Sequence, residues 1–103
     1  MKLSDEAQKL KDSIIQEFGI EGPADLAILN AAIGAFNLMR EAEELLARDG
    51  LTVQGDRGGT KANPAAAVLR DARSGFYAGM KALKLDEVDL WPGGQIGQKR
   101  GKL

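Results

Sequence analysis

The sequence contains no cysteine and no histidine among its 103 residues. Without cysteine the chain forms no disulfide and no thiolate metal site, and its redox compartment cannot be read from the sequence. Without histidine it has no imidazole general base, no Ser-His triad and none of the usual zinc sites. Aromatic residues make up only 5% of the chain, so few large rings are available for a core. We therefore expect no catalytic residues, no cofactor and no metal, and we predict that the protein is not an enzyme.

The sequence also has no large excess of positive or negative charge, and its formal net charge is -1. Such a chain is not a uniformly basic nucleic-acid binder, so any contact with nucleic acid must come from local clusters of lysine and arginine. The longest apolar run, 24–39, is interrupted by Asp25, Asn30 and Asn37 and is short for a membrane span. The opening residues, MKLSDEAQKLK, lack the apolar core of a signal peptide. We expect an intracellular, soluble protein without membrane contact.

The first predicted helix spans about residues 5–18. Ser4 is a good N-cap, and Asp5 and Glu6 suit the positive end of a helix. Gly19 is typical of a C-terminal glycine cap. Apolar residues recur at steps of three and four and define one apolar stripe, which consists of Leu3, Ala7, Leu10, Ile14 and Phe18.

The second predicted helix begins at the Gly22-Pro23 pair and runs to about Arg48, where Asp49-Gly50 ends it. Its first half is apolar nearly all round, and such a helix must be covered on all sides. Because two further helices cannot easily do that alone, we expect this half to be buried between subunits. The residues predicted to lie in the core or at an oligomer interface are Ile28, Ile33, Phe36 and Met39.

Asn30 and Asn37 in this helix are seven residues apart and are expected to share a face. Two interpretations are open. The two asparagines fix the register of an interface, as a single buried asparagine does in a coiled coil, or they mark the line that faces solvent.

The third predicted helix begins at Asn63-Pro64, with Asn63 as N-cap, and runs to about Leu85. At 100° per residue it has three adjacent stripes. One is large and apolar (Leu69, Phe76, Met80, Leu83), and beside it lies one of small residues that would let another helix come close (Val68, Ala72, Gly75, Gly79). The third is basic and contains no acidic residue: Arg70, Arg73, Tyr77, Lys81 and Lys84.

The basic stripe has two interpretations. Lysine and arginine often extend from an exposed helix face into solvent without further role. Alternatively the stripe contacts phosphate backbone, which requires cationic side chains and no base-specific chemistry.

The stretch between the second and third helices, LTVQGDRGGTKANP, contains three glycines. It does not fit a phosphate-binding loop, because Lys61 follows Thr60 and no serine or threonine follows Lys61. The pattern instead predicts a short β-like excursion, in which 51–53 extends, 55–59 turns and 60–61 returns. Arg57 lies at the tip and should be exposed.

The predicted fold class is therefore all-α: a helical hairpin of two long helices, an N-terminal helix, a short β-like turn and a flexible C-terminal tail. Residues 1–85 form a single helical domain in this prediction, and residues 86–103 form the tail. Lys99, Arg100 and Lys102 make the end of the tail basic. The segment 86–91 is expected either to dock on another protein or to fold back onto the core through Leu90 and Trp91.

The order of several short motifs resembles a known family. EFGI leads into ADLAILNAAIGAF, and LLARDGLTV is followed by a glycine turn, K-x-N-P and VLRDARSGFYAGMKALKL. Over residues 7–86 this order resembles the small subunit of phage terminase. Two departures concern the C-terminal side. The family's last helix usually ends near Gly-Leu followed by Pro or Ser, where this chain has KALKLDE, and the WPGG tail has no counterpart in the pattern.

The resemblance implies a non-enzymatic component of a phage DNA-packaging motor in the cytoplasm of the infected host cell. Such subunits are helical, assemble into rings, recognise viral DNA, and recruit and regulate a large subunit that carries the ATPase and nuclease. A ring would repeat the basic stripe and give avidity without a strongly basic monomer. No helix-turn-helix pattern is visible, so recognition would rely on DNA shape. The residues expected to contact double-stranded DNA are Arg57, Lys61, Arg70, Arg73, Lys81 and Lys84.

A different class stays open, namely a small helical adaptor or scaffold that binds only protein. The net charge of -1 fits it. An enzyme is the weakest alternative: Glu41, Glu43 and Glu44 are acidic enough for a metal, but on an exposed helix end such residues usually serve solubility.

Overall fold

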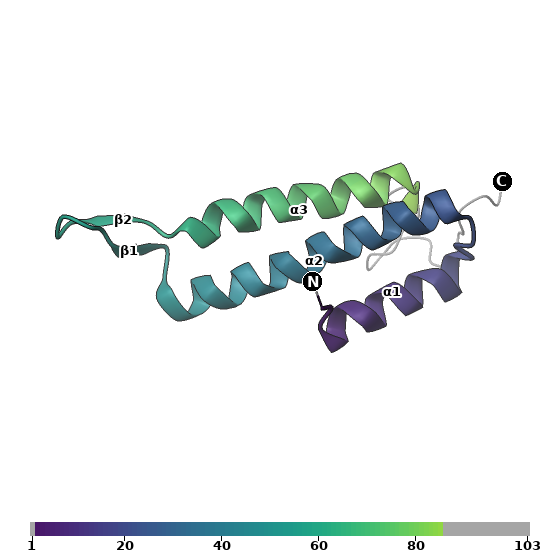
Figure 1. Cartoon of the computed structure of the whole chain (residues 1–103), viewed down its shortest axis with the longest axis horizontal. Coiled ribbons are helices and arrows are strands. Elements are labelled where there is room, and N and C mark those ends of the chain that lie inside the picture. Colours follow the sequence, from purple (N-terminus) through teal and green to yellow (C-terminus); the bar gives the residue numbers. More distant parts are fainter. Residues whose placement is uncertain (1, 86–103) are drawn as a thin grey trace, which may run out of the picture.

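The computed structural model describes residues 2–85. Within them the chain forms α1 (Asp5–Phe18), α2 (Pro23–Asp49), β1 (Thr52–Gln54), β2 (Thr60–Ala62) and α3 (Pro64–Ala82). Helices α2 and α3 form a long hairpin, and α1 lies beside the N-terminal half of α2 (Figure 1). The predicted helical hairpin with an N-terminal helix and a short β-like turn is confirmed. The predicted tail lies outside the described residues, together with its basic residues Lys99, Arg100 and Lys102 and the segment 86–91.

The ends of α1 follow from local capping. The Ser4 hydroxyl accepts a hydrogen bond from the Ala7 amide at 3.1 Å, and Asp5 and Glu6 occupy the positively polarised first turn. Gly19 ends the helix with a left-handed φ of 65°, and its amide donates to the Ile15 carbonyl at 3.0 Å. The predicted bounds of α1 are therefore confirmed.

Small residues set the spacing of the α2–α3 hairpin. An added Cβ on Gly79 would lie 2.5 Å from the Ala32 Cβ, and one on Gly75 would lie 3.6 Å from the Ala35 Cβ. The two helices therefore approach closely where α3 has no side chain, as the small-residue stripe predicts. Next to the Ala35–Gly75 contact the rings of Phe36 and Phe76 pack with centroids 5.5 Å apart.

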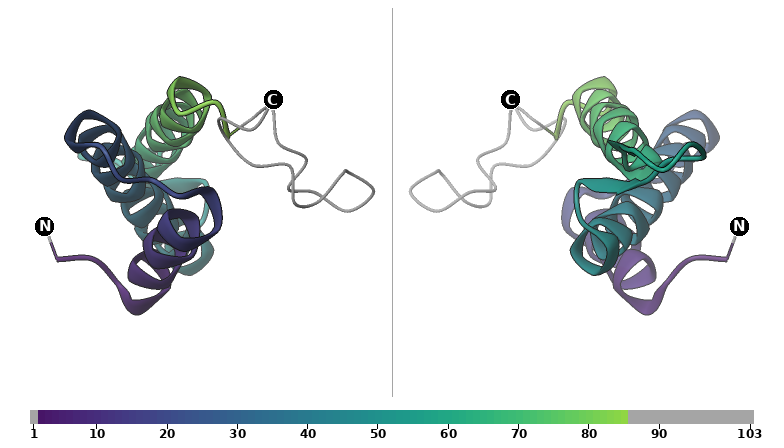
Figure 2. Two further views of the ribbon diagram at one scale, coloured as in Figure 1. Left: turned by 90° about the vertical axis from the view of Figure 1, so that its right-hand side faces the viewer. Right: turned by 90° about the vertical axis from the view of Figure 1, so that its left-hand side faces the viewer.

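The core lies where α1, the first half of α2 and the end of α3 meet. Its fully buried large side chains are Leu29, Ile33, Leu83 and Leu85. Viewed along the long axis, α1 and α3 lie on different sides of α2 (Figure 2). The second half of α2 packs against α3 but extends past α1 (Figure 1).

Helix α3 ends at Ala82, three residues before the predicted end at Leu85. Lys84 adopts a left-handed conformation with φ of 63°, which turns the chain out of the helix. Leu83 and Leu85 then both enter the core, with exposed fractions of 0% and 1%. Burial of two leucines offsets the cost of ending the helix early.

Asn30 and Asn37 do not share an environment. Asn37 is buried, and its side-chain oxygen accepts a hydrogen bond from the Ser4 amide at 2.9 Å. Asn30 is exposed. Asn37 therefore joins the start of α1 to the middle of α2 within one chain, a role that neither sequence-based interpretation included.

The two strands form an antiparallel pair in which Val53 lies opposite Lys61. The glycine turn between them includes Gly58, which has a φ of 85°. The hairpin projects beyond the helices (Figure 1). None of the described helices combines the length and the apolarity that crossing a membrane requires.

Candidate nucleic-acid interface

The basic stripe of α3 is open to solvent along its length. Arg70, Arg73, Lys81 and Lys84 are all exposed, and Tyr77 between them is 52% exposed. Rotation of 100° per residue places Arg70, Arg73, Tyr77 and Lys81 on one flank of α3, adjacent to the side that packs on α2. Lys84 follows the end of the helix and has a left-handed backbone. From Arg70 to Lys81 the helical part of the stripe is about 17 Å long at 1.5 Å per residue, which matches about five base pairs of duplex DNA at 3.4 Å per pair.

Most of the charge in the stripe is unpaired within the chain. Arg70 Nε lies 3.1 Å from the Asp71 carboxylate, but both side chains are more than 70% exposed, so the pair is weak. Within residues 2–85, no carboxylate forms an ion pair with Arg73, Lys81 or Lys84. Tyr77 packs against Phe76 with ring centroids 5.5 Å apart, which holds the tyrosine in place between the cations.

Arg57 and Lys61 lie apart from this stripe. Both are exposed, as predicted for Arg57, but they belong to the β1–β2 hairpin and not to α3. The hairpin and the C-terminal end of α3 lie at opposite ends of the molecule (Figure 1), whose longest dimension is 58 Å. The six predicted DNA contacts therefore divide into three on α3, one just after its end (Lys84), and a separate pair on the hairpin.

The hairpin is held to the helices by Asn63, which is 6% exposed. Its side-chain oxygen caps α3 by accepting from the Ala65 amide at 3.0 Å. Its side-chain nitrogen donates to the Gly50 carbonyl at 2.8 Å, and its backbone amide donates to the Leu51 carbonyl at 2.8 Å. The sequence indicates the cap but not the bonds to Gly50 and Leu51, because those depend on the hairpin bringing residues 13 positions apart together.

Asn63 also explains the order of the sequence motifs. The Asp-Gly-Leu segment ends α2, and Lys-x-Asn-Pro starts α3. The hydrogen bonds of Asn63 join the two segments at the base of the hairpin. The motif therefore builds a structural joint between the end of α2 and the start of α3.

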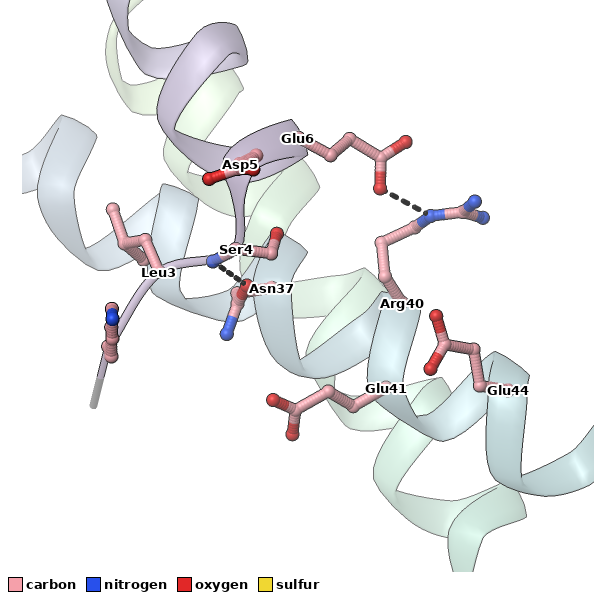
Figure 3. A pocket seen from close by; sticks show the side chains of 9 residues that line it. Leu3, Ser4, Asp5, Glu6, Asn37, Arg40, Glu41 and Glu44 are labelled. Atoms are coloured by element: carbon pink, nitrogen blue, oxygen red, sulfur yellow. Dashed lines mark hydrogen bonds and ion pairs between the residues drawn. The ribbon is translucent and has the colours of Figure 1, made fainter.

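A cleft lies elsewhere in the described part of the chain. It has a volume of about 600 Å³ and lies between the start of α1 and the middle of α2 (Figure 3). Its lining has more acidic than basic side chains and consists of Lys2, Leu3, Ser4, Asp5, Glu6, Asn37, Arg40, Glu41 and Glu44. An acidic cleft repels DNA, so we place the candidate nucleic-acid interface on α3.

Arg40 links the two helices beside this cleft. Its guanidinium contacts Glu6 of α1 at 3.0 Å and also pairs with Glu43, and hydrogen bonds to these carboxylates raise its pKa. The sequence does not indicate this link, because Glu6 and Arg40 are 34 residues apart. Among residues 2–85 no group of three or more acidic side chains could hold a metal ion.

The residues predicted for the core or an oligomer interface separate into two groups. Ile33 is fully buried within the chain and belongs to the core. Ile28, Phe36 and Met39 are half-buried. Phe36 packs on Phe76 across the hairpin, so its ring stabilises the subunit itself.

A comparison with protein-family models finds a match to the family described as "Phage terminase, small subunit" over residues 7–89. Neither the curated proteins nor the solved structures include a significant match to the chain. The family match spans the three helices, the β1–β2 hairpin and the Asn63 joint between them. The chain belongs to the phage terminase small-subunit family.

Proposed function

We propose that this protein is the DNA-binding small subunit of a phage packaging terminase, and that it acts as a homo-oligomer, with a ring as the favoured form. Its partners are double-stranded viral DNA and the terminase large subunit, and its place of action is the cytoplasm of the infected cell. The family match supports a role in phage DNA packaging. In this proposal the small subunit is not catalytic, and the large subunit supplies the ATPase and nuclease.

The observation that carries the proposal is the basic stripe of α3. Arg73, Lys81 and Lys84 are exposed and have no ion-pair partner within residues 2–85. Cations held at helical spacing are suited to phosphate contacts, which position a protein on DNA without reading its sequence. Arg57 and Lys61 would contact a second stretch of DNA from the hairpin.

Assembly makes such a short stripe effective. A single subunit offers only a few phosphate contacts, and its overall charge is slightly negative. When several subunits bind one DNA molecule, each further contact is intramolecular and affinity rises without any new type of interaction. The incompletely covered first half of α2 supports self-association.

The test is the double variant Arg73→Glu/Lys81→Glu, measured by fluorescence anisotropy with labelled duplex DNA at several salt concentrations. We expect affinity to fall at least tenfold, because four units of charge change within the stripe. The matched control is Lys2→Glu/Lys9→Glu, which makes the same charge change at two exposed residues outside the stripe. Affinity that falls equally in both variants, or in neither, would contradict the stripe.

A charged substitution at the predicted interface residue Phe36, such as Phe36→Asp, would not test assembly alone. The Phe36 ring lies against Phe76 within the subunit, so an aspartate there would weaken the α2–α3 hairpin as well as any interface.

A second candidate function is a protein-only adaptor, and the acidic cleft favours it. Asp5, Glu6, Glu41 and Glu44 line the cleft, which suits a basic protein segment better than DNA. A stable complex with the large subunit, combined with no DNA shift at low salt, would support this alternative.

A further inference from the structure

The β1–β2 hairpin presents one face of uncharged, mostly polar side chains to solvent. Side chains alternate between the two faces of a strand, and the register pairs Thr52 with Ala62 and Gln54 with Thr60. These four side chains therefore share one face of the two-stranded ribbon, and all four residues are exposed. We call this surface the polar face of the hairpin; it consists of Thr52, Gln54, Thr60 and Ala62.

The opposite face of the ribbon has a different chemistry. It carries Val53, which is half-buried, and Lys61, which lies directly across from it. The polar face itself has no large apolar side chain. Protein–protein interfaces are typically centred on buried aromatic or aliphatic anchors, so the polar face is better suited to a partner that offers hydrogen bonds.

The hairpin is fixed at both of its ends. At its base Asn63 donates hydrogen bonds to the Gly50 and Leu51 carbonyls, which lie at the end of α2. At its tip the Gly55 amide donates to the Gly59 carbonyl at 2.6 Å. The ribbon therefore projects beyond the helices as a paired element (Figure 1), with the polar face in a defined orientation.

Positive charge surrounds the polar face. Within residues 50–70 the one acidic residue is Asp56, against the three basic residues Arg57, Lys61 and Arg70, which gives this segment a net charge of +2. Arg57 and Lys61 are exposed and form no ion pair within residues 2–85. Arg70, the first cation of the basic stripe, lies about two turns into α3. The hairpin therefore lies beside the start of the basic stripe and shares its sign of charge.

We propose that the β1–β2 hairpin enters the major groove of duplex DNA and reads base edges with its polar face. This inference rests on the DNA binding in the proposed function and assigns sequence reading to an element separate from the stripe. The major groove is about 12 Å wide and admits a two-stranded β-ribbon. Each strand has three residues and is about 10 Å long at 3.3 Å per residue, so the polar face covers about three base pairs at 3.4 Å per pair.

The residue types on the polar face match the chemistry of the major groove. A glutamine amide such as that of Gln54 pairs with N6 and N7 of adenine, and threonine and alanine methyl groups pack on the methyl group of thymine. We therefore expect A·T base pairs where the polar face contacts the DNA. The basic stripe does not supply this selectivity, because phosphate contacts position a protein without reading sequence. Arg57 and Lys61 would contact the phosphates that border the groove.

A selection from a random-sequence duplex library tests the inference with the full chain. We expect the wild type to bind the selected site at least about tenfold more tightly than a scrambled duplex of the same composition, as measured by fluorescence anisotropy. Gln54→Ala should reduce this preference at least about fivefold. It should leave the slope of log K against log salt unchanged, because no charge changes. The matched control is Gln16→Ala, which removes an exposed glutamine from α1 and should keep the preference.

Gln54→Glu provides a second measurement, because loss of preference alone could come from a damaged hairpin. A carboxylate accepts a hydrogen bond from N4 of cytosine and has no donor for N7 of adenine. Library selection with this variant should therefore replace an A·T pair by a C·G pair at the contacted position. Selection of the wild-type site by Gln54→Glu would overturn the proposal.

The outcomes separate this inference from the proposed function. Duplex binding without any preferred site, or with a preference that Gln54→Ala retains, would overturn base reading by the hairpin and leave the DNA-binding function intact. Absence of duplex binding by the wild type would overturn both, and the hairpin would then be assigned to contact with a protein.

Discussion

Gly79 lies where α3 comes closest to α2, and Gly75 lies one turn away at a looser contact. Gly79→Ala would place a methyl group 2.5 Å from the Ala32 Cβ, so the helices must move apart. We expect a loss of about 1–3 kcal/mol in the free energy of unfolding, which is typical of overpacking. Urea unfolding followed by circular dichroism measures this value.

Gly75→Ala is the control, because its new methyl group would meet the Ala35 Cβ at an ordinary 3.6 Å. Replacing a glycine inside a helix should then stabilise the protein by about 0.5–1 kcal/mol. Because the two variants should change the free energy of unfolding in opposite directions, the comparison isolates the steric contact at Gly79. If both variants were stabilised, the close packing at Gly79 would be wrong.

Lys84 is the one non-glycine residue with positive φ in the described part of the chain. A left-handed conformation costs a side chain with a Cβ about 1–2 kcal/mol. Lys84→Gly should therefore increase the free energy of unfolding by about 1 kcal/mol, measured by urea unfolding at fixed protein concentration.

Lys84→Ala separates conformation from charge, because it removes the cation but keeps the Cβ. The free energy of unfolding of Lys84→Ala should not rise above that of the wild type. Both variants should lose some DNA affinity if Lys84 belongs to the interface. An alanine variant as stable as the glycine variant would show that charge, and not backbone strain, governs this position.

At the scale of elements, Asn63 connects α2, the hairpin and α3. Asn63→Ala removes the cap on Ala65 and the bond to the Gly50 carbonyl, and it leaves partly buried polar groups unpaired. We expect a loss of about 1–3 kcal/mol in the free energy of unfolding. Thermal or urea unfolding measures the change.

Two variants refine this prediction. Asn63→Asp keeps the cap acceptor but loses the donor to Gly50, so its stability should lie between those of wild type and Asn63→Ala. Asn30→Ala removes an exposed asparagine from α2 and should change stability by no more than about 0.5 kcal/mol. An Asn63→Ala variant as stable as Asn30→Ala would mean that the joint does not hold the hairpin.

Element boundaries could be predicted from the sequence wherever a local signal sets them. Ser4, Gly19 and Pro23 act through their own backbone geometry or hydrogen bonds to residues within one turn. The end of α3 could not be predicted, because it depends on Leu83 and Leu85 finding the core. Local pattern is sufficient for a cap but not for a residue whose conformation is set by distant packing.

The same distinction applies to the candidate site. Helical spacing alone predicts that Arg70, Arg73, Lys81 and Lys84 share one flank of the third helix. The structure has Arg70, Arg73 and Lys81 exposed on α3, whereas Lys84 lies after the end of the helix. It does not predict how far Arg57 lies from them, because that distance depends on the hairpin projecting from the helices. The acidic cleft could likewise not be predicted from the sequence, because its residues come from the start of α1 and the middle of α2.

At the scale of the whole molecule, charge is segregated although the total is close to zero. The basic stripe lies on the outer flank of α3, and Asp5, Glu41 and Glu44 line the cleft between α1 and α2. DNA binding can depend on the local basic stripe or on the net charge of the chain. Removal of acidic residues distinguishes these two causes, because it changes the net charge and leaves the stripe unchanged.

Glu41→Gln/Glu44→Gln raises the net charge by two without changing α3. Surface charges act over about 8–10 Å at physiological salt, and the helix pair separates the cleft from the stripe. We expect duplex DNA to bind slightly tighter at low salt and unchanged near 0.15 M, as measured by fluorescence anisotropy. The slope of log K against log salt should also stay unchanged, because the number of phosphate contacts is the same. A gain in affinity at 0.15 M that equals the loss in Arg73→Glu/Lys81→Glu would mean that net charge, and not the stripe on α3, determines DNA binding.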